Sequence, residues 1–301
     1  MNSNERQTSE RLDVSVLTSA RLRDFEEEVL SLCLSLDGRI SGERRRIGPF
    51  SVFLKGGPFS TKGARRHQLR GILLGASSPA LAEFRAAAWL RERLFQAPEP
   101  LAAVTVRRGI GPRRWKRPHA QLFISSEISG ATPFDRAWEE ASSVRRLHLC
   151  QELGGELGRM HALHFLHADL YPRNVLVKPA APTEDARRVP GRDLWFIDSW
   201  AGGATAWRNG SLRRLKTDLG TWLADFEPGL SERFLKEFLH AYADARSDNG
   251  RPLSSWMRWL RSIEEARRAE LRKLERQRYR LRGRPFPQAG MAASGLAPTS
   301  S

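Results

Sequence analysis

The stretch His167–Val177, HADLYPRNVLV, decides how the rest of the chain is interpreted. It carries Asp169 and Asn174 between a helical pattern that ends in MHALHFL and a short strand-like run, VLV. A second strand-like run, LWFIDSW, places Asp198 at its exit. Mg²⁺-assisted phosphoryl transfer requires three such oxygen donors. One carboxylate accepts a proton, and an amide and a second carboxylate hold the cation.

An aspartate followed by an asparagine is also common in ordinary turns, where both side chains bond their own backbone. The context favours the catalytic interpretation, because His167 precedes the pair, an apolar run follows it and Asp198 ends a second strand. We therefore expect this loop to present Asp169 and Asn174 at a phosphoryl-transfer site.

The composition describes a folded and strongly basic chain of 301 residues, with 50 Lys and Arg against 34 Asp and Glu and a net charge of +16. Such a charge suits nucleic acid, an anionic membrane surface or a polyanionic substrate, although Arg-rich solvated faces alone also produce it. Cys33 and Cys150 lie in helical apolar patterns, which indicates buried thiols in a reducing compartment. No apolar run has the length of a membrane span, so we expect a soluble or peripherally attached chain.

The periodicity of the first half predicts a polar, loose start over residues 1–17, followed by helices and strands. A proline start and an Ala-rich pattern predict a helix over Pro79–Leu94. The basic stretch Arg107–His119 is expected to be an exposed hairpin tip. The other expected elements are a helix around Leu22–Cys33, paired strands within Gly38–Lys55, and strands over Leu101–Val106 and Gln121–Ile128.

The second half is expected to be mainly helical. An apolar stripe predicts a long helix over Ala141–Leu166, with Val144 and Leu163 among its core residues, and a further helix covers Ser231–Tyr242. A polar hairpin excursion should separate the catalytic loop from Asp198. The last helix, Trp256–Arg282, mixes aromatic and basic residues, as a membrane-surface helix or an ordinary packing helix with a solvated basic face would.

The order of these blocks resembles the protein-kinase-like phosphotransferases, whose catalytic loop reads H-R-D-x-x-x-x-N. Within that superfamily the chain is most similar to the lipopolysaccharide kinase (Kdo/WaaP) family. The blocks that carry the resemblance are FLK, SPALAEFRAAAWL before PEPLAA, QLFISSEI, LGRMHALHFLHADLYPRNVLV, WFIDSW and LKTDLGTWL. Two departures are Ala168, where protein kinases usually have arginine, and Tyr171, where Ser/Thr kinases have a phosphate-binding lysine that Arg173 could replace.

The resemblance implies an α+β, bilobal protein-kinase-like fold with a small β-rich N-lobe and a larger, mostly helical C-lobe. The implied division is an N-terminal extension and helix at 1–35, the N-lobe at 36–128, the C-lobe at 129–260, and a basic helix with a disordered tail at 261–301.

The resemblance also implies a role for each site residue. Asp169 is the base, and Asn174 and Asp198 hold Mg²⁺. Lys55 binds the α- and β-phosphates of ATP, with Lys62 as the competing candidate, and Glu83 pairs with the lysine unless it is an ordinary solvated helix residue. Glu127 and Ile128 are expected at the hinge whose backbone meets adenine. The expected supporting residues are His167, Arg173 and Asp218. Asp218 either bonds the loop backbone or acts only as a helix cap.

The implied activity is transfer of the ATP γ-phosphate to a sugar hydroxyl, on Kdo or heptose of the lipopolysaccharide inner core. The implied location is the cytoplasm, with peripheral contact to the inner face of the inner membrane. The alternatives are a kinase of the same fold with another small-molecule or protein acceptor, a pseudokinase, and a nucleic-acid-binding protein that uses the basic helix and Arg107–Arg117. No recognised nucleic-acid motif supports the last alternative.

Overall fold

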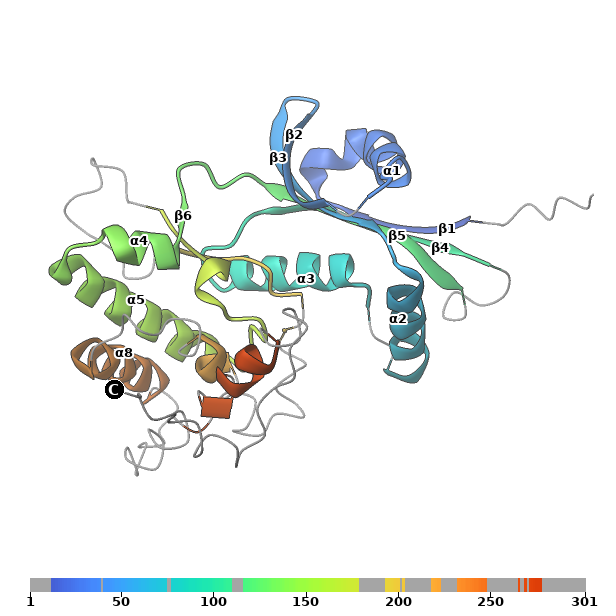
Figure 1. Cartoon of the computed structure of the whole chain (residues 1–301). Coiled ribbons are helices and arrows are strands. Elements are labelled where there is room, and N and C mark those ends of the chain that lie inside the picture. Colours follow the sequence, from blue (N-terminus) through green and yellow to red (C-terminus); the bar gives the residue numbers. More distant parts are fainter. Residues whose placement is uncertain are drawn as a thin grey trace, which may run out of the picture.

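The structure is a computed structural model, shown in Figure 1. It describes residues 12–38, 40–74, 77–109, 116–178, 193–200, 202–203, 218–222, 232–247, 265, 268–269 and 271–277. The expected excursion between the catalytic loop and Asp198, at residues 179–192, lies outside these ranges. So do most of the expected basic helix and the tail, although residues 271–277 are helical.

The N-terminal part is built on one antiparallel sheet with the strand order β1-β4-β5-β3-β2. Alternating apolar residues and the turn residues between the runs explain its two hairpins, β2–β3 and β4–β5, whereas β1 pairs with β4 and β3 pairs with β5 across longer connections. The strands β4 and β5 pair antiparallel as far as Arg108 and Arg117, and residues 110–115 of the expected hairpin tip lie outside the described ranges. The strands are β1 (Leu12–Thr18), β2 (Ile40–Ile47), β3 (Phe50–Pro58), β4 (Pro100–Arg108) and β5 (Arg117–Ser126).

The expectation of a loose start was wrong for residues 12–17, which belong to the edge strand β1. Its alternating sequence pairs with β4, where Val14 faces Val106 and Val16 faces Val104. Its pairing partner β4 lies far along the chain, and polar residues precede the strand. The sequence around residues 12–17 therefore did not indicate a strand.

Helices cover both faces of this sheet (Figure 1). The 3-10 helix η1 (Ala20–Phe25) and α1 (Glu26–Leu34) bury Leu22, Val29 and Cys33 against one face. Burial raises the pKa of the Cys33 thiol to about 12, which confirms the expected buried thiol. On the other face lies α3 (Pro79–Glu92), which begins where the Ser78 side chain accepts a hydrogen bond from the Leu81 amide. Sequence reasoning missed α2 (Thr61–Leu74).

The C-terminal part is mainly helical and contains a small sheet of order β6-β7-β8. The long helix ends at Ala162, and Val144 and Leu163 are exposed rather than core residues because they lie at its two ends. Residues 218–222 are also helical. The elements are β6 (Thr132–Pro133), α4 (Phe134–Glu140), α5 (Ser143–Ala162), η3 (Pro172–Asn174), β7 (Val175–Val177), β8 (Leu194–Phe196) and α8 (Glu232–Ser247).

The helices α5 and α8 pack closely because α5 presents glycines to α8. A Cβ atom on Gly154 would lie 2.2 Å from the carbonyl oxygen of Phe238, and one on Gly158 would lie 2.4 Å from that of Tyr242. The buried core beside this contact is rich in aromatic rings, such as Trp222 stacked on Phe238 at 5.0 Å.

The helix α3 contributes to the cores of both parts. Ala80, near its start, packs with Ala103 and Phe123 of the N-terminal sheet, whereas Ala86 and Leu90 belong to the large C-terminal core. The result is an α+β protein with an N-terminal antiparallel sheet and a helical C-terminal part, which confirms the expected class. Among the described residues, no helix has the length and apolar character needed to cross a membrane.

Candidate active site

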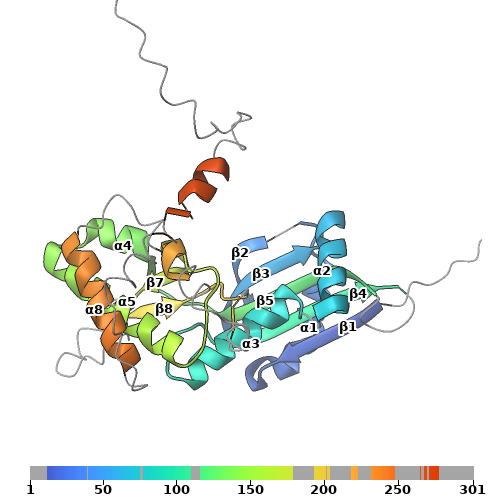
Figure 2. The ribbon, with the colours of Figure 1, turned by 90° about the horizontal axis from the view of Figure 1, so that it is seen from below.

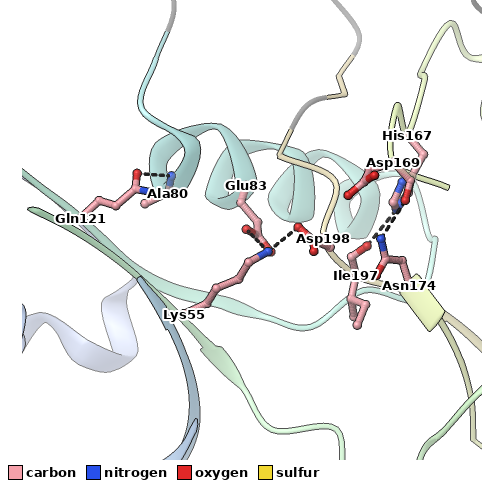
Figure 3. Close-up of polar contacts among 9 residues, drawn as sticks. All are labelled: Lys55, Ala80, Glu83, Gln121, His167, Asp169, Asn174, Ile197 and Asp198. Atoms are coloured by element: carbon pink, nitrogen blue, oxygen red, sulfur yellow. Dashed lines mark hydrogen bonds and ion pairs between the residues drawn. The ribbon is translucent and has the colours of Figure 1, made fainter. Parts of the chain in front are cut away.

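Three side chains that lie far apart in the sequence meet beneath the N-terminal sheet (Figure 3). Lys55 extends from β3, and its Nζ lies 3.1 Å from Oε2 of Glu83 on α3. The same ammonium group donates a short hydrogen bond to Oδ1 of Asp198, which follows β8. The structure thus brings together the expected lysine, helical glutamate and strand-end aspartate. Lys62, the competing lysine, is exposed on α2 and does not line this cleft.

Burial shifts the pKa values of Glu83 and Lys55. Glu83 is 7% exposed, and its burial raises the pKa of the carboxyl to about 7, although Lys55 opposes the shift. Burial would lower the pKa of Lys55, but the Glu83 and Asp198 carboxylates outweigh it and the pKa is raised. Lys55 therefore stays an ammonium ion at neutral pH.

The loop from His167 to Asn174 is held together by its own hydrogen bonds. Asn174 Nδ2 donates to the carbonyl oxygen of Asp169 at 2.8 Å, and the amide of Tyr171 donates to the same oxygen at 2.9 Å. Because the Asn174 amide nitrogen is used in this way, its Oδ1 remains available as a ligand. The fold of the loop therefore fixes the orientation of the carboxamide.

Two hydrogen bonds tie this loop to the segment that carries Asp198. The amide of Ile197 donates to the carbonyl oxygen of Asn174 at 3.0 Å, and His167 Nε2 lies 2.9 Å from the carbonyl oxygen of Ile197. A carbonyl oxygen can only accept, so His167 carries its proton on Nε2. Burial lowers the pKa of His167 despite the nearby Asp218 and Asp169, which keeps the ring neutral.

Asp218 supports the loop from behind. Its two carboxylate oxygens accept hydrogen bonds from the amides of His167 and Ala168, both at 2.8 Å. Ala168 has a φ of 63°, a strained conformation for a residue with a side chain, and these bonds hold it there. The sequence did not indicate that His161 and Tyr242 back Asp218, with His161 Nε2 at 3.3 Å from Asp218 and Nδ1 at 2.7 Å from the Tyr242 hydroxyl.

The chain just after Asp198 lies directly against the loop from His167 to Asn174. Asp198 itself has a φ of 61°, and the amide of Gly203 donates to the carbonyl oxygen of Leu166 at 2.9 Å. A Cβ atom on Gly202 would lie 2.0 Å from that oxygen and 2.6 Å from the His167 oxygen. Only glycine permits this approach, which fixes the two segments relative to each other.

A cleft of about 390 Å³ lies at this site, and Lys55, Glu83, Asn174 and Asp198 line it. Asp169 lies beside the cleft, and burial, followed by repulsion from Asp198, raises its pKa. At the opposite wall Glu127 is held by Ser51 Oγ at 2.7 Å and Arg44 Nε at 3.0 Å, two partners that sequence reasoning missed because they belong to other strands. The expected site residues that line the cleft are Lys55, Glu83, Glu127, Ile128, Arg173, Asn174 and Asp198.

The oxygen donors suit a hard divalent cation. The Asp198 carboxylate and the free Oδ1 of Asn174 are the ligand types that Mg²⁺ takes beside phosphate and water oxygens. Among the described residues, no three His, Cys, Asp or Glu side chains form a group that could hold a metal ion. Two protein ligands are what a Mg²⁺–nucleotide site needs.

The sheet carries Lys55 on one side of the cleft, and the helical part carries the His167–Asn174 loop on the other. This is the architecture of the kinase-like fold. A solved structure described as "WaaP in complex with acyl carrier protein" matches with a TM-score of 0.56 and 20% sequence identity, over 88% of this chain and 99% of that one, which confirms the fold. Residues 62–242 match the profile of the lipopolysaccharide kinase (Kdo/WaaP) family. The chain belongs to this family.

Curated relatives agree with this assignment. A protein named 3-deoxy-D-manno-octulosonic acid kinase from Vibrio vulnificus strain CMCP6 is 26% identical over 168 residues, which are 51% of this chain and 63% of the relative. The protein of the same name from Vibrio cholerae is 24% identical over 198 residues, covering 61% and 73%. The chain therefore spans just under two thirds of the length of the Vibrio vulnificus relative.

Proposed function

We propose that this chain is an ATP-dependent kinase that phosphorylates a sugar hydroxyl, on Kdo or heptose of the lipopolysaccharide inner core. The observation that carries the proposal is the meeting of Lys55, Glu83 and Asp198 at one cleft, with Asn174 in its wall and Asp169 beside it. A lysine paired with a helical glutamate opposite a metal-binding aspartate is the arrangement that phosphoryl transfer from ATP uses.

The nucleotide would lie in the cleft with its adenine against the backbone of Glu127 and Ile128. Lys55, oriented by Glu83, would then contact the α- and β-phosphates. Asn174 and Asp198 would hold Mg²⁺. The chemistry that Mg²⁺ held there would supply is neutralisation of the charge that develops on the phosphate oxygens. In this scheme Lys55 also serves Asp198, because the ion pair between them holds that carboxylate at the cleft.

Asp169 would accept the proton of the attacking hydroxyl. Its raised pKa moves the carboxylate toward the range in which a base is effective. Arg173, whose guanidinium lies 4.0 Å from the centre of the Tyr171 ring, adds a positive charge to the cleft wall and would bind an anionic group of the acceptor or the transferred phosphate.

The acceptor is inferred from the family and from the names of the two relatives. A glycolipid of the lipopolysaccharide inner core is anionic, which suits a chain with a net charge of +16. Such an acceptor would be met at the cytoplasmic face of the inner membrane, where the protein would make peripheral contact.

The test is ATP consumption by the purified chain with Mg²⁺, measured with and without lipid A–Kdo or inner-core lipopolysaccharide, beside Asp169→Ala. We expect turnover that requires the glycolipid and is lost in the variant, with the phosphate recovered on the sugar. Nucleotide binding without stimulation by any glycolipid would retain the kinase site but reject the acceptor. Failure to bind ATP would reject the proposed function.

A further inference from the structure

The helix α2 presents one face that no other described element covers. It packs mainly on β5, with Ala64 buried and His67 half-buried. At 100° per residue, its exposed basic and leucine side chains fall within an arc of about 140°. They are Lys62, Arg65, Arg66, Leu69, Arg70 and Leu73.

The two leucines occupy the middle of this face. Leu69 is 57% exposed and Leu73 is 75% exposed, which is unusual for large apolar side chains one helical turn apart. From the same helical angles, Arg65 lies on one side of them and Arg66 and Arg70 lie on the other. The face therefore presents two leucines with Arg65 on one side and Arg66 and Arg70 on the other, and Lys62 lies two turns before Leu69 at the same helical angle.

The charge of this face is not compensated locally. The helix α2 has no acidic residue, and none of its three arginines forms an ion pair among the described residues. Burial lowers the pKa of His67, and so do Arg70, Arg66 and Arg107, which shows that the surroundings are positive. Anions are therefore favoured on this face.

A second basic feature adjoins the base of the helix. A recess of about 310 Å³ lies between α2 and the ends of β4 and β5, and Arg108, Arg117 and His119 line it together with Phe59 and Ala64. The exposed side chains of Arg108 and Arg117 extend the positive surface from α2 onto the sheet.

The helix is also placed where a flat surface could reach it. It projects from the end of the N-terminal sheet, on the same side as α3 and far from α5 and α8, as both views show (Figures 1 and 2). The exposed face therefore lies at one extremity of the described chain.

We propose that the exposed face of α2 docks the protein on an anionic lipid bilayer, with Leu69 and Leu73 between the headgroups and the flanking arginines on lipid phosphates. Two exposed leucines flanked on both sides by arginines match the layering of a membrane surface, whose apolar region lies beneath a layer of phosphates. A nucleic acid would satisfy the arginines without a need for two exposed leucines. The proposal deepens the proposed function, because it names the surface that would bring the cleft to a membrane-embedded glycolipid.

The test uses the full chain and vesicles of phosphatidylcholine, with or without phosphatidylglycerol, and measures co-sedimentation without ATP or acceptor. We expect the wild-type chain to bind only the anionic vesicles. The triple variant Arg65→Gln, Arg66→Gln, Arg70→Gln should bind on the order of 100-fold more weakly, at roughly fivefold per arginine. The double variant Leu69→Gln, Leu73→Gln should lose on the order of 10-fold, although its charge is unchanged.

The matched control is the triple variant Arg23→Gln, Arg46→Gln, Arg136→Gln, which removes the same charge from exposed positions elsewhere. It should bind anionic vesicles nearly as well as the wild type. Glutamine keeps the helix propensity of α2, so the melting temperatures of all variants should agree.

Equal losses in the control and the α2 triple variant would overturn the proposal, because attraction by net charge would then be sufficient. So would α2 variants that bind vesicles normally but lose affinity for single-stranded RNA or an acidic protein. Phosphorylation of a water-soluble, Kdo-containing oligosaccharide, measured separately, tests the proposed function and should be unaffected by the α2 variants. The two proposals can therefore fail independently.

Discussion

At the scale of single residues, the site is organised by one cation shared between two carboxylates. Lys55 contacts both Glu83 and Asp198, while Asp169 adds a third acidic group nearby. Without Lys55, these acids would repel one another, and burial would favour the protonated form of Glu83 more strongly. The lysine therefore influences the protonation of Glu83 in addition to its proposed contact with phosphate.

The proposed base is tested by Asp169→Asn, which removes the charge and nearly keeps the size of the side chain. We expect kcat to fall by about 10²–10⁴-fold, because proton acceptance is lost, while KM for ATP changes little. Steady-state kinetics with the glycolipid acceptor measure both constants. Asp135→Asn, at an exposed position on α4, is the control and should match the wild type. An Asp169→Asn enzyme with wild-type kcat would exclude the base role.

The buried Glu83 makes stability depend on pH. Its folded-state pKa of about 7 lies above the ordinary value of 4.5, so its contribution is fully present below the ordinary pKa and is lost as the pH rises through 7. Between pH 5 and pH 8, the wild type should therefore lose about 2 kcal/mol of unfolding free energy relative to Glu83→Gln. Denaturant unfolding of both proteins at the two pH values measures this difference, and a difference that stays constant with pH would contradict the expectation.

At the scale of elements, the contact between α5 and α8 depends on glycines that have no space for a side chain. Gly154→Ala and Gly158→Ala would each place a methyl group against backbone of α8, and we expect a loss of about 1–3 kcal/mol in stability. Gly155, on the same helix, has no atom within 4 Å of an added Cβ. Gly155→Ala should therefore stabilise the protein by about 0.5–1 kcal/mol. Thermal unfolding of the three variants measures the change in stability that each substitution causes. A change of the same sign in all three would show that α5 and α8 pack less closely than described.

Elements with local signals were predictable from the sequence. The helix α3 has a serine cap and a proline start, and the His167–Asn174 loop carries a motif whose spacing needs no distant partner. By contrast, β1 depends on pairing with β4, and α2 has two glycines and no clear apolar stripe. The partners of Asp218 and Glu127 were also missed, because hydrogen bonds between distant segments leave no pattern in the sequence.

At the scale of the whole molecule, α3 belongs to the large C-terminal core and to the small cluster that packs on the N-terminal sheet, and it also carries Glu83. We expect Leu90→Ala to cost about 2–5 kcal/mol in stability and to raise KM for ATP, because a loosened α3 holds Glu83 less firmly against Lys55. Leu22→Ala is the matched control, since Leu22 is equally buried but lies on η1, in the N-terminal core that contains no residue of α3. It should cost a similar amount of stability and leave KM for ATP unchanged. Chemical unfolding and ATP titrations distinguish the two, and equal effects on KM would mean that α3 has no special role.

The edge strand β1 also determines how the chain can be shortened. It covers one side of β4, and the Ser19 amide continues this contact with a hydrogen bond to the carbonyl oxygen of Leu101 at 2.7 Å. A protein that began after Thr18 would expose the backbone donors and acceptors of β4, a strand whose residues are nearly all buried. Such an open edge pairs readily with a second copy of itself. We therefore expect β1 to protect the protein against self-association, and removal of residues 1–18 to favour aggregates.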